Sequence, residues 1–174
     1  MSAAPRLLCS LVLTAALIGA APAIARAQGG TQVPVPHEQT VSANPFLLIV
    51  GWFNAEYERK LTPRTTWGLS ASYLDIDEFD YVNGAALVRF YPQGAALSGL
   101  FVGGRAGVHR VSDDDESGVA FGVGFELGYN WLLGADRNFD ISIGAGATRL
   151  FGADLEGDSV TIPQIRLVNI GYAF

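Results

Sequence analysis

Between Val119 and Leu133, large and small side chains alternate at every second position. The odd positions carry Val, Phe, Val, Phe, Leu, Tyr, Trp and Leu, whereas the even positions carry Ala, Gly, Gly, Glu, Gly, Asn and Leu. A period of two predicts a β-strand with two different faces. The segment is long enough to cross a bilayer as a strand. Because glycine can line a narrow barrel but cannot fill a core, we expect the large residues to face lipid.

Four further segments show the same alternation, and they predict strands of the same kind. The expected outward positions are Trp67, Leu69, Ala71 and Tyr73; Val82, Ala86, Val88 and Phe90; Leu100, Val102, Ala106 and Val108; and Phe139, Ile141, Ile143, Ala145 and Ala147. Two residues depart from the pattern. Phe101 falls on the inward parity, and Arg166 falls on the outward parity of the last strand. We expect Arg166 to snorkel toward the far membrane interface.

The chain closes on an apolar alternation made by Val168, Ile170, Tyr172 and Phe174. An aromatic C-terminal residue at the end of such an alternation is typical of the final strand of a bacterial outer-membrane barrel. We therefore expect these four residues to be the signal that the barrel-assembly machinery recognises.

The strand count favours a closed barrel. A seventh strand is expected from about Trp52 to Lys60, and closed bacterial barrels normally have an even number. The missing strand is expected at Gln39–Ala43, followed over Asn44–Gly51 by a tight bend or a short helical turn opened by Pro45. The predicted fold class is all-β, a closed antiparallel transmembrane β-barrel of eight strands.

The N-terminal segment has the features of a secretory signal peptide. Arg6 precedes an apolar run from Leu7 to Ala25, and Ala25-Arg26-Ala27 fits a small-residue cleavage site. The predicted organisation is a signal peptide at 1–27, a flexible periplasmic lead-in at 28–38 and an outer-membrane barrel at 39–174. Cleavage near Ala27 would leave no cysteine, which excludes a disulfide framework and a cysteine metal site.

Charge is concentrated in the connections between the predicted strands. The formal net charge is −6, and no basic stripe is present, so nucleic acid is not an expected partner. The connections at 75–80, 112–118 and 152–159 hold 11 of the 17 acidic residues and no lysine or arginine. Short turns alternate with these acidic connections. With the C-terminus on the periplasmic side, the acidic loops are expected to face outside.

Six charged residues have the inward parity: Glu56, Glu58, Arg89, Arg105, Glu126 and Asp140. An eight-stranded barrel leaves a lumen about as wide as the side chains that fill it. Unpaired charges in such a lumen would be costly, so we expect an ion-pair network that plugs the interior. The alternative is a narrow or gated conduit lined by the same groups.

One acidic loop contains four consecutive carboxylates, Asp113, Asp114, Asp115 and Glu116. Oxygen ligands of this kind suit calcium or magnesium, and they could join the divalent-cation lattice of lipopolysaccharide outside the membrane. Their spacing does not match the twelve-residue calcium loop. The alternative is a solvated loop with no ligand.

Catalysis is not expected from this sequence. His109 and Ser112 lie close to the outer rim, but residues three apart on a strand point to opposite faces. His109 should instead enter a lumen hydrogen-bond network, and His37 has no second ligand nearby for a metal. No catalytic residue, metal or cofactor is therefore assigned.

Several motifs together carry a family resemblance over most of the chain from about residue 40. They are Asn44-Pro45, Glu56-Tyr57-Glu58-Arg59, Arg89-Phe90-Tyr91-Pro92, Gly128-Tyr129-Asn130-Trp131-Leu132-Leu133-Gly134 and Gly171-Tyr172-Ala173-Phe174. On these motifs the chain resembles the small outer-membrane barrels of the OmpA/OmpX and OmpW-like groups. More narrowly, it resembles a bacterial family of eight-stranded barrels of unknown function. The resemblance implies a fold and a location, and no reaction.

The expected role is structural or one of surface interaction, with outer-membrane lipid and lipopolysaccharide as partners. The alternative is a transporter of small or hydrophobic solutes through the wall or a narrow lumen, and a lipid-modifying enzyme is a remote alternative. A monomer is expected, because the outward face shows no polar seam.

Overall fold

The structure is a computed structural model that describes residues 36–76, 79–93, 95–112, 117–152 and 159–174. The predicted signal peptide and the lead-in up to residue 35 lie outside this part, as does the run Asp113–Glu116. His37 and Glu38, at the end of the predicted lead-in, are bonded to the barrel. The Glu38 amide donates to the Phe174 carbonyl over 3.1 Å, and the Lys60 ammonium donates to the His37 carbonyl over 3.0 Å.

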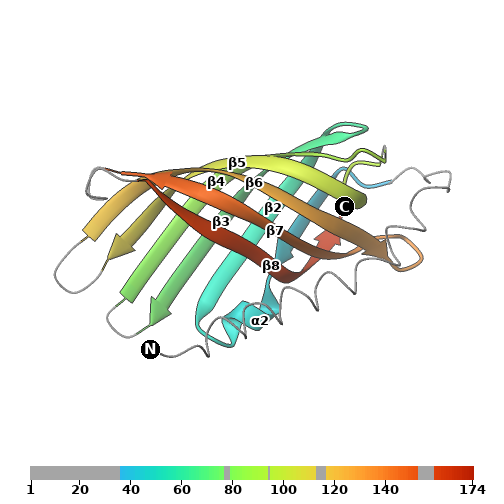
Figure 1. Ribbon diagram of the computed structural model, residues 1–174. Helices are drawn as coiled ribbons and strands as arrows, with labels where there is room; N and C mark the ends of the chain where they lie inside the picture. Colours follow the sequence, from blue (N-terminus) through green and yellow to red (C-terminus); the bar gives the residue numbers. More distant parts are fainter. Residues whose placement is uncertain (1–35, 77–78, 94, 113–116, 153–158) are drawn as a thin grey trace, which may run out of the picture. The chain divides into compact units, whose positions relative to one another are not determined.

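Eight antiparallel strands form a closed barrel in chain order, with one short helix after the first strand (Figure 1). The elements are β1 Gln39–Ala43, α2 Pro45–Leu48, β2 Trp52–Thr62, β3 Thr65–Ile76, β4 Phe79–Phe90, β5 Gly99–Ser112, β6 Ser117–Leu133, β7 Phe139–Phe151 and β8 Val160–Ala173. The predicted fold class is confirmed. So is the first strand at Gln39–Ala43, followed by a helical turn.

The helical turn has a clear local cause. The Asn44 side-chain oxygen accepts from the amides of Phe46 and Leu47 over 3.0 and 3.1 Å, and Pro45 occupies the first helical position. Gly51 has a φ of 78°, which glycine adopts without strain, and it turns the chain into β2.

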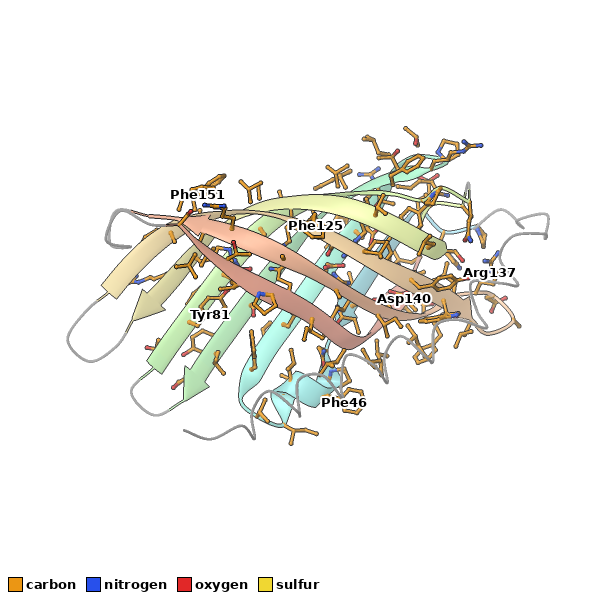
Figure 2. All side chains as sticks on the ribbon, viewed as in Figure 1. Phe46, Tyr81, Phe125, Arg137, Asp140 and Phe151 are labelled. Carbon is orange, nitrogen blue, oxygen red and sulfur yellow. The ribbon has the colours of Figure 1, made fainter. Side chains whose placement is uncertain are left out.

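Inward and outward faces follow the predicted parity along β6. Phe125 is 64% exposed, whereas the next residue, Glu126, is 6% exposed. Phe46, Phe125 and Phe151, labelled in Figure 2, belong to the exposed apolar residues that surround the barrel. Phe101 is fully buried, as its inward parity predicts. The described barrel therefore has an apolar exterior and a polar interior.

A bulge in β8 overturns one expectation. Ser142 pairs with Asn169, but Gly144 pairs with Arg166, so one residue of β7 lies opposite both Leu167 and Val168. The extra residue inverts the parity of the strand beyond it. Arg166 consequently points inward, and the expectation that it snorkels on the outward face is wrong.

The connection between β4 and β5 folds into the short-turn end of the lumen. Leu97 and Ala95 pack against Leu132 and Ala173, which are inward-facing residues of β6 and β8. A hydrogen bond of 2.8 Å from the Ala96 amide to the Pro63 carbonyl fixes the connection to the neighbouring turn. Buried apolar residues therefore fill this end of the barrel.

Candidate functional site: the charged lumen

Arg89 of β4 is the centre of the lumen cluster and is fully buried. Its Nη1 lies 2.7 Å from Glu56 Oε1 and also pairs with Glu58 Oε2, while its Nε lies 2.5 Å from Glu126 Oε1. The three carboxylates come from β2 and β6 and are themselves nearly buried. Four of the six predicted lumen residues are thus brought together by the closure of the barrel.

Arg166 of β8 is the second cation of the cluster. Its Nη1 donates to Glu56 Oε1 over 2.8 Å, its Nη2 pairs with Glu56 Oε2, and Nη2 lies 3.6 Å from Glu126 Oε2. The sequence pattern does not place this residue in the lumen, because the bulge inverts the parity. The only signal in the sequence is the adjacent apolar pair Leu167-Val168, which breaks the alternation.

Neutral groups complete the shell around Glu58 and Arg89. Thr66 Oγ1 and the Tyr91 hydroxyl both donate to Glu58 Oε1, over 2.5 and 2.6 Å. The Phe101 ring centroid lies 4.5 Å from the Arg89 guanidinium carbon, a cation–π distance. Tyr91 follows β4, and burial together with the Glu58 carboxylate raises the pKa of its phenol well above the usual range. Tyr91 is therefore a neutral donor at physiological pH.

Glycine supplies the space that the long charged side chains need. A Cβ built on Gly103 would lie 3.0 Å from Arg89 Cγ, 3.2 Å from Glu126 Cγ and 2.9 Å from the Val88 carbonyl oxygen. The contact with the carbonyl oxygen is closer than real Cβ atoms come, and the other two are unusually tight. The small residue and the large ion pair therefore occupy the same layer of the lumen.

Arg105 and Asp140 are not brought into this cluster. Arg105 Nη2 donates to Ser70 Oγ over 2.9 Å and forms no ion pair with a described carboxylate. Asp140 Oδ2 accepts from Thr40 Oγ1 over 3.1 Å, and its other oxygen is buried without a partner. Inward-facing side chains of opposite charge therefore do not always form ion pairs.

A cavity of about 180 Å³ lies beside the cluster. Glu56, Glu126 and Arg166 line it together with Arg105 and Ser70. This volume is far above what a single water needs, and its polar walls can hold water. Hence the lumen is packed at the cluster and hollow next to it.

His109 belongs to a hydrogen-bond network, as expected for a lumen histidine. Its Nδ1 lies 2.7 Å from the Tyr81 hydroxyl and 3.0 Å from Asn83 Nδ2. The side chain of Ser112 lies outside the described part, so its relation to His109 stays a prediction. His37 Nε2 hydrogen bonds to the Asp136 carbonyl over 2.7 Å. Within the described ranges, no three His, Cys, Asp or Glu residues gather as metal ligands.

The C-terminal residues of the predicted assembly signal end the barrel. Phe174 and Gln39 exchange two backbone hydrogen bonds of 2.9 and 3.0 Å. The rings of Tyr172 and Phe174 stack with centroids 6.4 Å apart, and both side chains are exposed. Val168 and Ile170 are half-buried. Their recognition by assembly machinery stays a prediction, as does cation binding by Asp113–Glu116.

Comparison with known proteins gives a family and two similar folds. None of the curated proteins matches the chain. The N-terminal β-barrel domain of Pseudomonas aeruginosa OprF is 17% identical, with 79% of this chain and 98% of that chain covered and a TM-score of 0.45. Yersinia pestis outer membrane protein Ail, solved in a phospholipid bilayer nanodisc, is 15% identical, with 79% and 99% covered and a TM-score of 0.47. No helix in the described part combines the length and hydropathy of a membrane span. A family model described as "Protein of unknown function (DUF3575)" matches residues 12–154, which is most of the chain. The chain therefore belongs to the DUF3575 family.

Proposed function

We propose that this protein is an integral outer-membrane β-barrel with a closed lumen and a structural or surface-interaction role. The observation that carries the proposal is the fully buried Arg89, held by three carboxylates inside a barrel whose exterior is apolar. Closure of the barrel pairs the backbone of each strand with its neighbours over most of the sheet, which is a requirement for strands in lipid.

The outward face supports a membrane location. Large apolar residues are exposed on every long strand, among them Leu69, Val88, Val108, Phe125 and Leu167. A contiguous apolar exterior of this kind would promote aggregation in water, whereas hydrocarbon solvates it. By the order of turns and loops, the inward-folded β4–β5 connection is periplasmic and the acidic loops are extracellular.

Two barriers in series support a non-conducting lumen. The first is the cluster of Arg89, Arg166 and their carboxylates, and the second is the buried β4–β5 connection around Leu97. Tyr91 joins the two, because it donates to Glu58 and packs against Ala96 and Phe101. An ion crossing the barrel would have to displace both.

Conductance measurements test the closed lumen. Purified wild-type protein in planar bilayers should carry no current, and Arg89→Ala should also carry none, because the second barrier remains. Replacing residues 92–98 by a short glycine-containing turn in the Arg89→Ala background should open a pore. Currents from wild-type protein that rise in Arg89→Ala would overturn the proposal in favour of a gated conduit.

The surface role rests on the acidic loops, and lipopolysaccharide is the proposed partner. The purified protein in detergent should bind lipopolysaccharide in a calcium-dependent manner, and this binding should be lost when Asp113, Asp114, Asp115 and Glu116 become Asn or Gln. Equal calcium dependence of the variant would refute this part. Lipid A mass spectra that change on expression would instead indicate an enzyme.

A further inference from the structure

The barrel is closed along one seam by very few pairs. β1 pairs with β8 only from Thr40–Ala173 to Ala43–Ile170, whereas β5 and β6 pair from Gly99–Asn130 to Ser112–Ser117. The part of β8 before Ile170, which begins at Val160, pairs only with β7 within the described chain. This part contains Pro163, which has no amide hydrogen to donate and is tolerated at a free edge.

The helix α2 occupies the seam and faces an apolar environment. It contacts both β2 and β8, the strands that flank the gap (Figure 1). Phe46, Leu48, Ile49 and Val50 are each more than half exposed, and no residue from Gln39 to Ala55 is charged. The other connections on this side of the barrel are acidic. This one therefore has the composition of a segment that lies in the bilayer rather than above it.

The cavity beside the ion cluster extends to the wall of the barrel at this seam. Its lining includes Asn44 and Leu47 on one side and residues of β8 on the other. Among the latter, Pro163 and Ile165 have the outward parity, and Ile165 is 61% exposed. Arg105 and Gln164 line the same cavity from the inside. The cavity is thus bounded both by lumen residues and by residues of the seam whose side chains face outward.

Two polar side chains that line the cavity, Arg105 and Gln164, have fewer hydrogen-bond or ion-pair partners than the neighbouring charged residues. Arg89 and Arg166 are ion-paired, whereas Arg105 has only the Ser70 hydroxyl as a partner in the described part. Gln164 Oε1 is buried and accepts no hydrogen bond. Glu56 and Glu126 attract Arg105 through space, but both carboxylates are bound directly by Arg89 or Arg166. An anionic head group would supply the direct ion pair that the Arg105 guanidinium does not make.

We propose that the seam binds a single-chain amphiphile, its carboxylate on Arg105 and its alkyl chain passing between β8 and α2 into the bilayer. The proposal rests on the membrane location proposed above. The cavity is smaller than the roughly 300 Å³ at which sites for drug-sized ligands begin. It therefore admits a small head group, and the chain remains outside against the exposed residues of α2.

Trp52 can report binding, because it lines the cavity and donates to Ser72 Oγ on the lumen side. The full chain with Trp67→Phe and Trp131→Phe is reconstituted in phosphatidylcholine vesicles at alkaline pH. Stearic acid carrying a nitroxide near its carboxyl end serves as the quencher, and its methyl ester is the uncharged control probe. We expect saturable quenching by the acid, reversal by unlabelled laurate, and no saturable quenching by the ester.

Arg105→Gln and Arg59→Gln form the matched pair of variants, since both remove one arginine but Arg59 is exposed and does not line the cavity. Arg105→Gln should weaken the affinity about tenfold, the size of a charged hydrogen bond, and Arg59→Gln should leave it unchanged. Quenching that is linear for acid and ester alike would overturn the proposal, as would saturable binding that ignores Arg105. Heat-dependent gel mobility and conductance on the same samples show independently whether the closed barrel itself stands.

Discussion

Arg166 and Glu56 form a two-point ion pair across the seam that β1 leaves short. The two residues are 110 positions apart, and Arg166 Nη1 donates to Glu56 Oε1 over 2.8 Å. Arg166 lies on β8 and Glu56 on β2, so the pair ties together strands that share only the short β1 between them. The lumen cluster therefore stabilises the closed barrel by linking β8 to β2.

Removing the Arg166 side chain should destabilise the closed barrel. Arg166→Ala leaves the Glu56 carboxylate with one cation instead of two, and breaking a buried pair costs about 3 kcal/mol. Urea unfolding in lipid vesicles measures the loss. Arg149→Ala is the control, because Arg149 is exposed and its contacts in the described part are a hydrogen bond to Ser159 and a cation–π contact with Phe151, not an ion pair. Equal stability of the two variants would contradict the assigned role.

Arg89 and Glu58 should be energetically coupled. Arg89→Met leaves three nearly buried carboxylates with too few cations, which should cost about 3–5 kcal/mol of unfolding free energy. Adding Glu58→Gln removes one of those charges, so the double variant should recover part of the loss. The double-mutant cycle in urea gives the coupling energy. Strictly additive effects would show that the ion pair contributes nothing of its own.

The bulge in β8 compensates for the outward parity of Arg166 in the sequence. Deleting Leu167 places Arg166 two positions before Asn169, so a regular ladder still puts Arg166 opposite Gly144 and facing the lumen. We expect the folded yield, measured as the heat-dependent shift in gel mobility, to stay close to that of the wild type. Adding Arg166→Ala to the deletion should cost about as much as Arg166→Ala alone, because the charge faces the lumen in both chains. A strong fall in yield on deletion alone would show that the bulge is needed for more than the position of Arg166.

An added methyl group should have opposite effects at a glycine in the charged layer and at a glycine on the outward face. Gly103→Ala places a Cβ against the Val88 carbonyl, Arg89 and Glu126, and overpacking of this kind costs about 1–3 kcal/mol. Gly84→Ala is the matched control, since its Cβ would meet nothing within 4 Å. Urea unfolding should separate the two. A neutral Gly103→Ala would show that the lumen adjusts more easily than its packing indicates.

Local pattern was sufficient for the architecture. The period of two gave the long strands and their inward and outward faces, as Phe125 and Glu126 show. Gln39–Ala43 could be located because an even strand number required one more strand, and Pro45 after Asn44 indicated the helical turn. These features depend on a residue and its near neighbours, which a sequence displays directly.

The pairing of charges was decided by the tertiary structure. Parity says that Arg89, Arg105 and Asp140 point inward, but not which layer of the lumen each occupies. The register between strands sets the layer: it places Arg89 beside Glu56, Glu58 and Glu126 and leaves Arg105 with Ser70. A single bulge then moves Arg166 from the lipid face into the cluster. Because register and bulges arise from contacts between distant segments, alternation within one strand could not reveal them.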